Sequence, residues 1–595
     1  MKNLFYLNKY LIQYKWHLVL GLVFVFLSNY FAVWQPKMIR EALDLVVDNV
    51  NLIRNFDDYE IKGQILEDFS YALFLFGLIV ILLSVTTGFF MYWMRQTVIV
   101  MSRLIEYDLR KEVFDKYESL DLAFYKRNKT GDLMSRITED VSKVRMYLGP
   151  VILYGMNLTS LTILVMYSMF SVNVKMSLYS LAPLPFLSLS IYYVSSIINK
   201  KSTKIQQQLA VLNNISQEVY SGIRVVKSYV QESAMVKMFS LESEAYKGKA
   251  MELARIDAMF YPLMILLIGI STIITVLIGG FQVAKGEISP GNIAEFVIYV
   301  NMLTWPVTSI GWIASIIQQA EASQKRLNEF LEIDSSISNQ GSINEVKGQI
   351  EFNNVDFVYP DTGIKALSGL NFKLPKGGKL AIVGKTGSGK TTLADLLVRM
   401  YDASKGEILI DGHDIQKFDL NVLRKSIGYV PQDIFLYSDT IYSNIVFGLE
   451  EHNKEEVERY ANYASVHEDI MSLDQGYDTF VGERGVTLSG GQKQRITIAR
   501  ALIKKPQIVI LDDCLSAVDT STEKHILSHL EKELKNKTTV IITHRIYSFF
   551  TFDKIIVLDE GRITEEGTHE ELLANKGFYY DMFEKQQLEE ETIKH

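Results

Sequence analysis

Six long apolar segments in the first half of the chain constrain its fold more than any other feature. Each approaches or exceeds the ~20 mostly apolar residues that a helix needs to cross a bilayer. The segments are 16–34, 69–94, 146–170, 176–198, 258–281 and 293–316. A buried core helix could explain one such segment. Six of them in succession predict an all-α membrane domain.

The charge of the connecting loops predicts the orientation of this domain. The long loops 95–145 and 199–257 carry many Lys and Arg residues, whereas loop 39–68 is acidic. Because loops rich in Lys and Arg stay in the cytosol, we expect both of these loops and both termini to be cytosolic. Apolar residues at three- and four-residue spacing through 104–114 and 209–226 also predict helices that continue beyond the membrane and pack on a cytosolic domain.

Composition excludes several other classes of protein. The net charge of −8 argues against nucleic acid as the main partner, because a duplex-binding protein normally has a basic surface. A single cysteine, Cys514, excludes an intrachain disulfide and a Cys-based zinc site. The start, 1–15, is polar and basic, and the apolar segment after it is long enough to span a membrane, so we expect no cleavable signal peptide.

The second half of the chain has a different pattern. After residue 349, short β-rich runs such as KLAIVG, IVILDD and TTVIIT alternate with helical segments, which predicts an α/β domain with a largely parallel sheet. We therefore expect a transmembrane domain with six helices and two long cytosolic loops over 1–330, a polar linker over 331–347 and a nucleotide-binding domain over 348–595.

A glycine-rich loop follows the apolar strand 379–383 and opens a helical run, as a phosphate-binding loop requires. Its residues are Gly384, Lys385, Thr386, Gly387, Ser388, Gly389, Lys390, Thr391 and Thr392. Backbone N–H groups of such a loop surround the phosphates, and the helix N-terminus adds a favourable dipole. Lys390 should reach the β- and γ-phosphates, and the Thr391 hydroxyl should bind Mg²⁺.

A second strand, 508–512, ends in a carboxylate. Beside the phosphate loop, Asp512 would hold Mg²⁺, and we expect a water molecule in between. A strand that ends in Asp is common, so this prediction depends on the phosphate loop.

Residues 488–492 read LSGGQ, shortly before the Asp512 strand. This sequence resembles the signature of ATP-binding cassette (ABC) proteins, and the six apolar segments in front resemble the exporter branch of that family. The resemblance extends over nearly the whole chain. It implies ATP and Mg²⁺ as cofactors and assigns Ser489, Gly490, Gly491 and Gln492 to nucleotide binding across a dimer of cassettes.

Further positions match the family in the same order along the chain. The resemblance implies that Tyr359 stacks on adenine, that Gln432 contacts Mg²⁺ and the γ-phosphate, and that His544 is the switch histidine. It also implies that Asp519 lies in the loop that crosses between the two cassettes. By the same resemblance, 124–131 and 222–229 are the two coupling helices, and 479–485 is the cassette loop that contacts them.

One position departs from the family pattern. Where the family usually has a glutamate that polarises the attacking water, this chain has Asp513. Aspartate is one methylene shorter, and an ångström-scale misplacement of a base can cost ~100-fold in rate. A weakened catalytic carboxylate with an intact signature resembles heterodimeric bacterial exporters, in which one site hydrolyses ATP and the other mainly holds it. The resemblance therefore implies a weak catalytic site in a heterodimer with an unlike half-transporter. A homodimer with two slow sites is the alternative.

The resemblance predicts an ATPase that exports hydrophobic or amphipathic compounds, such as drugs or lipids, across the bacterial cytoplasmic membrane. Aromatic residues are frequent in the apolar segments, and buried charges are few. The other class of function is a regulatory or channel-like protein that binds ATP without pumping. The presence of Lys390, Asp512, His544 and LSGGQ favours the pump.

Overall fold

The computed structural model describes residues 2–55, 62–515, 520–547 and 550–593, which form two compact units. The first unit contains Met1–Tyr117 and Gly131–Ile333. The second contains Asp334–His595 together with Glu118–Thr130. The short segment Glu118–Thr130 therefore packs with the second unit, although in sequence it lies between two helices of the first.

Within the described residues, six helices are long and apolar enough to cross a membrane. Each predicted apolar segment lies inside one of these membrane spans, and the spans Thr130–Val172 and Val174–Ser221 also include the shorter helices that precede α7 and α9. The long helices are α2 (Lys15–Asn55), α3 (Lys62–Ser119), α7 (Ile152–Val172), α9 (Pro183–Ser221), α11 (Glu232–Ala284) and α12 (Pro290–Leu331). Shorter elements of this unit are η1 (Lys2–Leu7), α1 (Asn8–Gln13), α5 (Thr130–Ser135), η2 (Arg136–Asp140), α6 (Val141–Met146), η3 (Tyr147–Val151), α8 (Val174–Leu181) and α10 (Ile223–Ser228).

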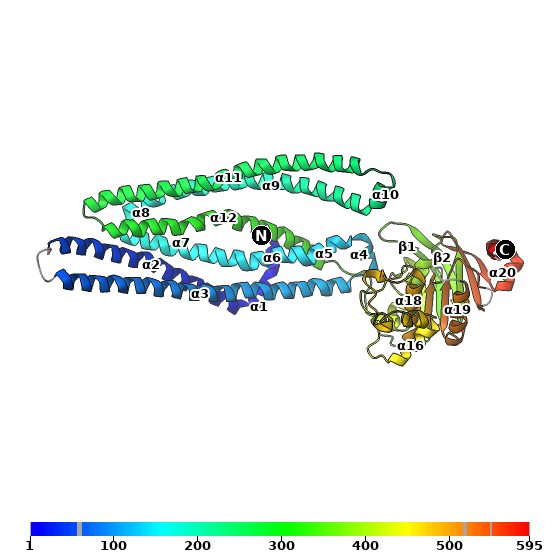
Figure 1. Cartoon of the computed structure of the whole chain (residues 1–595). Coiled ribbons are helices and arrows are strands. Elements are labelled where there is room, and N and C mark those ends of the chain that lie inside the picture. Colours follow the sequence, from blue (N-terminus) through cyan, green and yellow to red (C-terminus); the bar gives the residue numbers. More distant parts are fainter. Residues whose placement is uncertain (1, 56–61, 516–519, 548–549, 594–595) are drawn as a thin grey trace. The chain divides into compact units, whose positions relative to one another are not determined.

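Several of these helices are much longer than a membrane is thick. The 58 residues of α3 span about 87 Å at 1.5 Å per residue, against a hydrocarbon core of about 30 Å. Helices α9 and α11 lie side by side along their length (Figure 1). The apolar pattern predicted one helical run through 209–226, but α9 ends at Ser221 and α10 begins at Ile223, with Gly222 as the C-cap of α9 between them.

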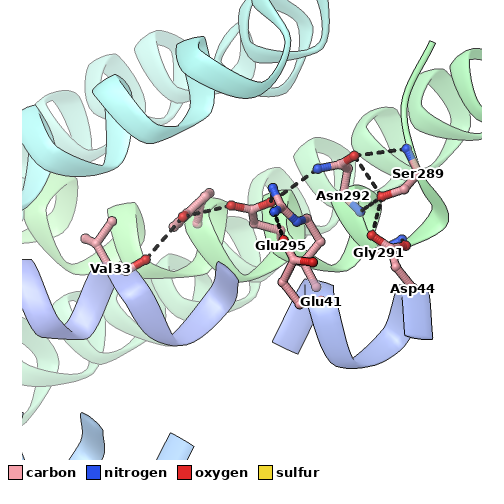
Figure 2. Close-up of polar contacts among 9 residues, drawn as sticks. Val33, Glu41, Asp44, Ser289, Gly291, Asn292 and Glu295 are labelled. Carbon is pink, nitrogen blue, oxygen red and sulfur yellow. Dashed lines mark hydrogen bonds and ion pairs between the residues drawn. The ribbon is translucent and has the colours of Figure 1, made fainter. Parts of the chain in front are cut away.

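A buried polar cluster joins α2 to the first turns of α12 (Figure 2). The side chain of Glu295 is fully buried, 3.3 Å from Arg40, and accepts hydrogen bonds from Tyr299 (3.0 Å) and Asn292 (3.3 Å). One turn further out, Asp44 accepts hydrogen bonds from the Ser289 hydroxyl and the Gly291 N–H, at 2.6 and 2.7 Å. Ser289 also caps α12 in a reciprocal capping box with Asn292.

The second unit contains two sheets. Six strands form a sheet in the order β10-β9-β3-β8-β7-β6, and all neighbours are parallel except β10 and β9. Its strands are β3 (Lys379–Gly384), β6 (Ile427–Val430), β7 (Ile508–Asp512), β8 (Thr538–Ile542), β9 (Lys554–Asp559) and β10 (Arg562–Gly567). Strands β7 and β8 are buried along their whole length, as expected for parallel strands covered on both faces.

A separate antiparallel sheet, β2-β1-β4-β5, was not distinguished in the sequence analysis. Its strands are β1 (Ile350–Val358), β2 (Lys365–Leu374), β4 (Lys405–Ile410) and β5 (His413–Asp414). The helices of this unit are α4 (Leu122–Arg127), α13 (Lys390–Leu397), η4 (Ile415–Lys417), α14 (Leu420–Lys425), α15 (Ile441–Val446), α16 (Lys454–Tyr463), α17 (His467–Met471), η5 (Gly476–Asp478), η6 (Glu483–Gly485), α18 (Gly490–Ile503), α19 (Thr520–Glu533), α20 (His569–Asn575) and α21 (Phe578–Ile593).

Candidate nucleotide site

The predicted phosphate loop connects β3 to α13. Two of its glycines allow the backbone to approach neighbouring segments closely. Gly384 (φ +155°) lies where a Cβ would come within 2.1 Å of the Leu558 carbonyl oxygen, and Gly389 (φ +98°) where it would come within 2.5 Å of the Ala366 carbonyl oxygen. The Lys390 ammonium donates to the carbonyls of Gly384 and Lys385, at 2.8 and 2.7 Å. The loop therefore curls around the cation at the start of α13.

Asp512 ends β7, two strands from β3 in the parallel sheet, so both strands present their carboxyl ends at the same edge. The residue is 1% exposed, and burial raises the pKa of its carboxyl to about 6, although a hydrogen bond from Thr391 lowers it. Burial also lowers the pKa of Lys390, against the attraction of Asp512 and Asp513. Oδ2 of Asp512 is buried without a hydrogen-bond partner. An orphaned carboxylate oxygen beside a threonine hydroxyl suits a hard divalent cation such as Mg²⁺.

A cavity of about 440 Å³ brings together most of the predicted nucleotide-binding residues. Predicted residues that line it are Tyr359, Thr386, Gly387, Gly389, Lys390, Thr391, Thr392, Gln432, Asp512, Asp513 and His544. Lining residues that the sequence analysis missed are Ile364, Lys365, Ala366, Thr543, Glu560 and Gly561. Thr543 adjoins the predicted His544, whereas no motif marks the other five, which reach the cavity only through their position in the fold.

Tyr359 lies just after β1 at one end of this cavity. Its hydroxyl is 2.8 Å from that of Thr392 in α13, which fixes the ring beside the phosphate loop. Burial raises the pKa of the phenol, which therefore stays neutral. The ring meets Phe357 and Tyr401 edge-on, with centroid separations of 4.9 and 5.6 Å. One aromatic ring next to the phosphate loop can stack on a nucleotide base.

Asp513 follows Asp512 and turns the chain out of the sheet. Its φ of +46° is in the left-handed region, which is uncommon for a residue other than glycine. Oδ1 of Asp513 is 2.9 Å from Nδ1 of His544, whose side chain is 53% exposed. The carboxylate and the imidazole therefore form a pair at the mouth of the cavity.

The residues of the LSGGQ sequence lie elsewhere in the unit. Ser489 caps α18 in a capping box with Gln492, and Gly490 and Gly491 form the first turn. None of these four residues lines the cavity that contains the phosphate loop. Asp519, the remaining predicted residue, lies outside the described residues.

Comparisons with known proteins agree with this geometry. Residues 18–307 match the ABC transporter transmembrane region, and residues 367–516 match the ABC transporter ATPase-domain model. The chain is 37% identical over 567 residues to a probable multidrug resistance ABC transporter ATP-binding/permease protein of Bacillus subtilis, covering 94% of this chain and 96% of the relative.

Two further proteins extend the comparison. An ATP-dependent lipid A-core flippase of Syntrophus aciditrophicus is 34% identical, covering 86% of this chain and 85% of the flippase. A bacterial Atm1-family ABC exporter solved with ATP bound superposes with a TM-score of 0.75 at 25% identity, covering 98% of both chains. Six apolar helices, an α/β ATPase unit and these matches over almost the full length show that the chain belongs to the ABC transporter family, as an exporter-type half-transporter whose ATPase domain is coupled to transport.

Proposed function

We propose that this chain is one half of a dimeric ABC exporter that moves hydrophobic or amphipathic compounds, drugs or lipids, out of the cell or between leaflets of the cytoplasmic membrane. The observation that carries the proposal is the cavity that joins the phosphate loop, Asp512 and His544 in a chain with six membrane-type helices. The names of the relatives, multidrug transporters and a lipid A flippase, support this class of substrate.

The residues of the cavity divide the work on ATP. Tyr359 would stack on the base, and Lys390 with the loop N–H groups would neutralise the phosphates. Thr391, Gln432 and Asp512 would hold Mg²⁺, which supplies charge neutralisation at the β- and γ-phosphates. The LSGGQ sequence lies outside this cavity and would complete the nucleotide site of a second cassette through Ser489, Gly490, Gly491 and Gln492.

The hydrolytic end of the cavity supports an asymmetric dimer. A general base must come within hydrogen-bond reach of the attacking water. The Asp513 carboxylate is short, and its Oδ1 is already 2.9 Å from His544. We therefore propose slow hydrolysis at this site and an unlike half-transporter, with glutamate at the equivalent position, as partner.

The proposal includes an orientation of the chain in the membrane. Basic loops 95–145 and 199–257 and the cassette would lie in the cytosol together with both termini, and the acidic loop 39–68 would lie outside. ATP would favour the outward-open state only to the extent that it binds the closed cassette dimer more tightly.

The test is ATPase activity of the purified chain in lipid, alone and with a candidate partner chain. Asp513→Glu should raise the activity of the chain alone about tenfold, because the longer side chain reaches the water. The unlike partner should raise it as well. Full activity of the chain alone, unchanged by Asp513→Glu, would contradict the asymmetric dimer and indicate a homodimer with a competent aspartate.

Transport is measured in the same vesicles. Uptake of fluorescent phospholipid or hydrophobic dye into inside-out vesicles should require ATP and should stop in Lys390→Met. ATP binding without any ATP-dependent movement of either class of compound would contradict the export function and favour the regulatory or channel-like alternative.

A further inference from the structure

The segment Asp334–Ile343, called the strap below, follows α12. It packs on the rest of the second unit, which contains the nucleotide cavity and is called the cassette. Its polar composition predicted a linker, but its backbone and side chains are bonded along its length. Asn339 accepts a hydrogen bond from the Leu420 N–H at 2.7 Å, and the Ile343 N–H donates to the Lys417 carbonyl at 3.1 Å. Gly341 lies so close to Phe418 that a Cβ would come within 2.0 Å of its carbonyl oxygen. The strap is therefore seated on the cassette.

One end of the strap holds α4. Asp121, the N-cap of α4, accepts a hydrogen bond from the Phe124 N–H at 2.9 Å through one carboxylate oxygen. The other oxygen accepts from the Ser336 N–H at 2.7 Å and from the Ser336 hydroxyl. Partial burial raises the pKa of this carboxyl, but the hydrogen bonds from Ser336 and Phe124 outweigh it and hold the pKa below its usual range. One side chain thus caps α4 and fastens it to the strap.

The middle of the strap is held by the end of the phosphate-loop helix. Arg399 directly follows Val398, the C-cap of α13. Its side chain is 2% exposed and donates a hydrogen bond from Nη2 to the Ser338 carbonyl at 3.2 Å. Its Nε donates to Asp402 at 2.9 Å, and Arg424 donates to the Arg399 carbonyl at 2.8 Å. A buried guanidinium is costly to displace, so the end of α13 and the strap move together.

The two contacts form a continuous connection. It runs from the phosphate loop through α13 and Arg399 to Ser338, then along two residues of the strap to Ser336 and Asp121 at the start of α4. Helix α4 is also anchored directly, because Ala123 is buried in the apolar core of the cassette.

We propose that Asp121 and Arg399 are positioning residues that transmit the state of the phosphate loop to α4 through the strap. The inference rests on the proposed transport function and on the resemblance by which 124–131, which overlaps the end of α4, is a coupling helix between the cassette and the membrane helices. Neither residue touches the nucleotide cavity. Loss of either one weakens the link between nucleotide state and membrane helices while the ATPase chemistry remains.

The experiment is hydrogen–deuterium exchange of the full chain in lipid nanodiscs, without nucleotide and with Mg²⁺ and a non-hydrolysable ATP analogue, alongside ATPase kinetics. Asp121→Asn keeps the size and the cap but removes the charge that accepts two bonds from Ser336. In the nucleotide-free chain it should speed exchange of α4 amides about tenfold. With the ATP analogue, the change in exchange at 131–146, which follows α4, should fall at least threefold, while kcat for ATP stays within about twofold.

Three other variants sharpen the result. Arg399→Lys keeps the buried charge and should reduce the nucleotide response in the same way, and Asp121→Glu should restore part of it. Asp553→Asn is the matched control, because Asp553 is an exposed aspartate that accepts a hydrogen bond from the Lys379 N–H at 2.8 Å and has no described contact with the strap or α4. Wild-type behaviour of both Asp121→Asn and Arg399→Lys would overturn the proposal, as would the absence of any nucleotide response at 131–146 in the wild type. The nucleotide-free comparison needs no ATP turnover, so it tests the contact between Asp121 and the strap separately from the transport function.

Discussion

The molecule contains two buried charged clusters that are built on opposite principles. Between α2 and α12, the carboxylate of Glu295 has Arg40, Tyr299 and Asn292 as partners (Figure 2). In the cassette, Oδ2 of Asp512 is buried without a hydrogen-bond partner. Burial raises the pKa of Asp512 and lowers that of Lys390, so it disfavours the charged form of both side chains. The protein itself satisfies the first cluster, whereas the second leaves part of its charge uncompensated.

This difference separates a structural cluster from a binding site. Buried charge that the protein compensates contributes to holding helices together and has little left to offer a ligand. Buried charge that the protein leaves uncompensated costs stability, and a ligand of opposite charge recovers that cost on binding. The two clusters should therefore respond to substitution in opposite ways.

The largest effect is expected at Glu295. Glu295→Ala removes the buried partner of Arg40, Tyr299 and Asn292 and should cost about 3 kcal/mol of stability. Thermal unfolding of the purified chain in detergent measures the loss. Glu287→Ala, an exposed carboxylate just before the same helix, is the control and should leave the unfolding temperature unchanged. Equal stability of the two variants would show that the cluster contributes nothing.

Lys390 should behave in the reverse manner. Lys390→Met removes a partly buried cation whose pKa is lowered by burial, so the unfolding temperature without nucleotide should hold or rise slightly. ATPase activity of the active dimer at this site should fall about 100-fold, because the phosphates lose their main cation. A variant that unfolds at a lower temperature and keeps its activity would reverse the assignment of the two clusters.

How far the sequence predicts each region follows from the same contrast. The six membrane helices follow from apolar composition, and the phosphate loop follows from a fixed order of glycines, Lys390 and Thr391, so both are local in sequence. Arg40 and Glu295 are 255 residues apart in the sequence, and their contact depends on how α2 packs on α12, which no local pattern encodes.

The strap illustrates a second limit. Its serines, asparagine and glycine have the composition of a flexible linker. Only the positions of Asp121 and Arg399, far away in sequence, turn that composition into a bonded segment. The pairing of Asp513 with His544 likewise depends on β7 and β8 lying next to each other in the sheet.

The raised pKa of Asp512 gives a smaller effect with a defined sign. Its carboxyl titrates at about 6 in the folded chain, above the ordinary value of 3.8, so the folded state binds more protons between those pH values. Stability without Mg²⁺ should therefore rise as the pH falls through 6, with no further gain from this group below about 4. Binding of Mg²⁺ needs the ionised form, so affinity for the Mg²⁺ complex of a fluorescent ATP analogue should fall about fourfold from pH 7.5 to 5.5. The same titration in EDTA is the control, and an equal loss there would exclude Asp512 as the cause.

A similarly small effect is expected at the base end of the cavity, where α4 contacts Tyr359. The Lys126 ammonium lies 4.8 Å from the ring centroid of Tyr359 and 5.3 Å from that of Tyr401. A cation over an aromatic face contributes only about 0.5–1 kcal/mol at an exposed site. Lys126→Met should therefore change KM for ATP by about two- to fivefold with little change in kcat, because it removes a contact that positions the Tyr359 ring and leaves the groups around the phosphates unchanged. Lys129→Met, two positions beyond α4, removes an exposed charge of the same kind and is the matched control. If both variants shift KM equally, the cause is the net charge near the cavity and not the contact with Tyr359, and the base end would then depend on the cassette alone.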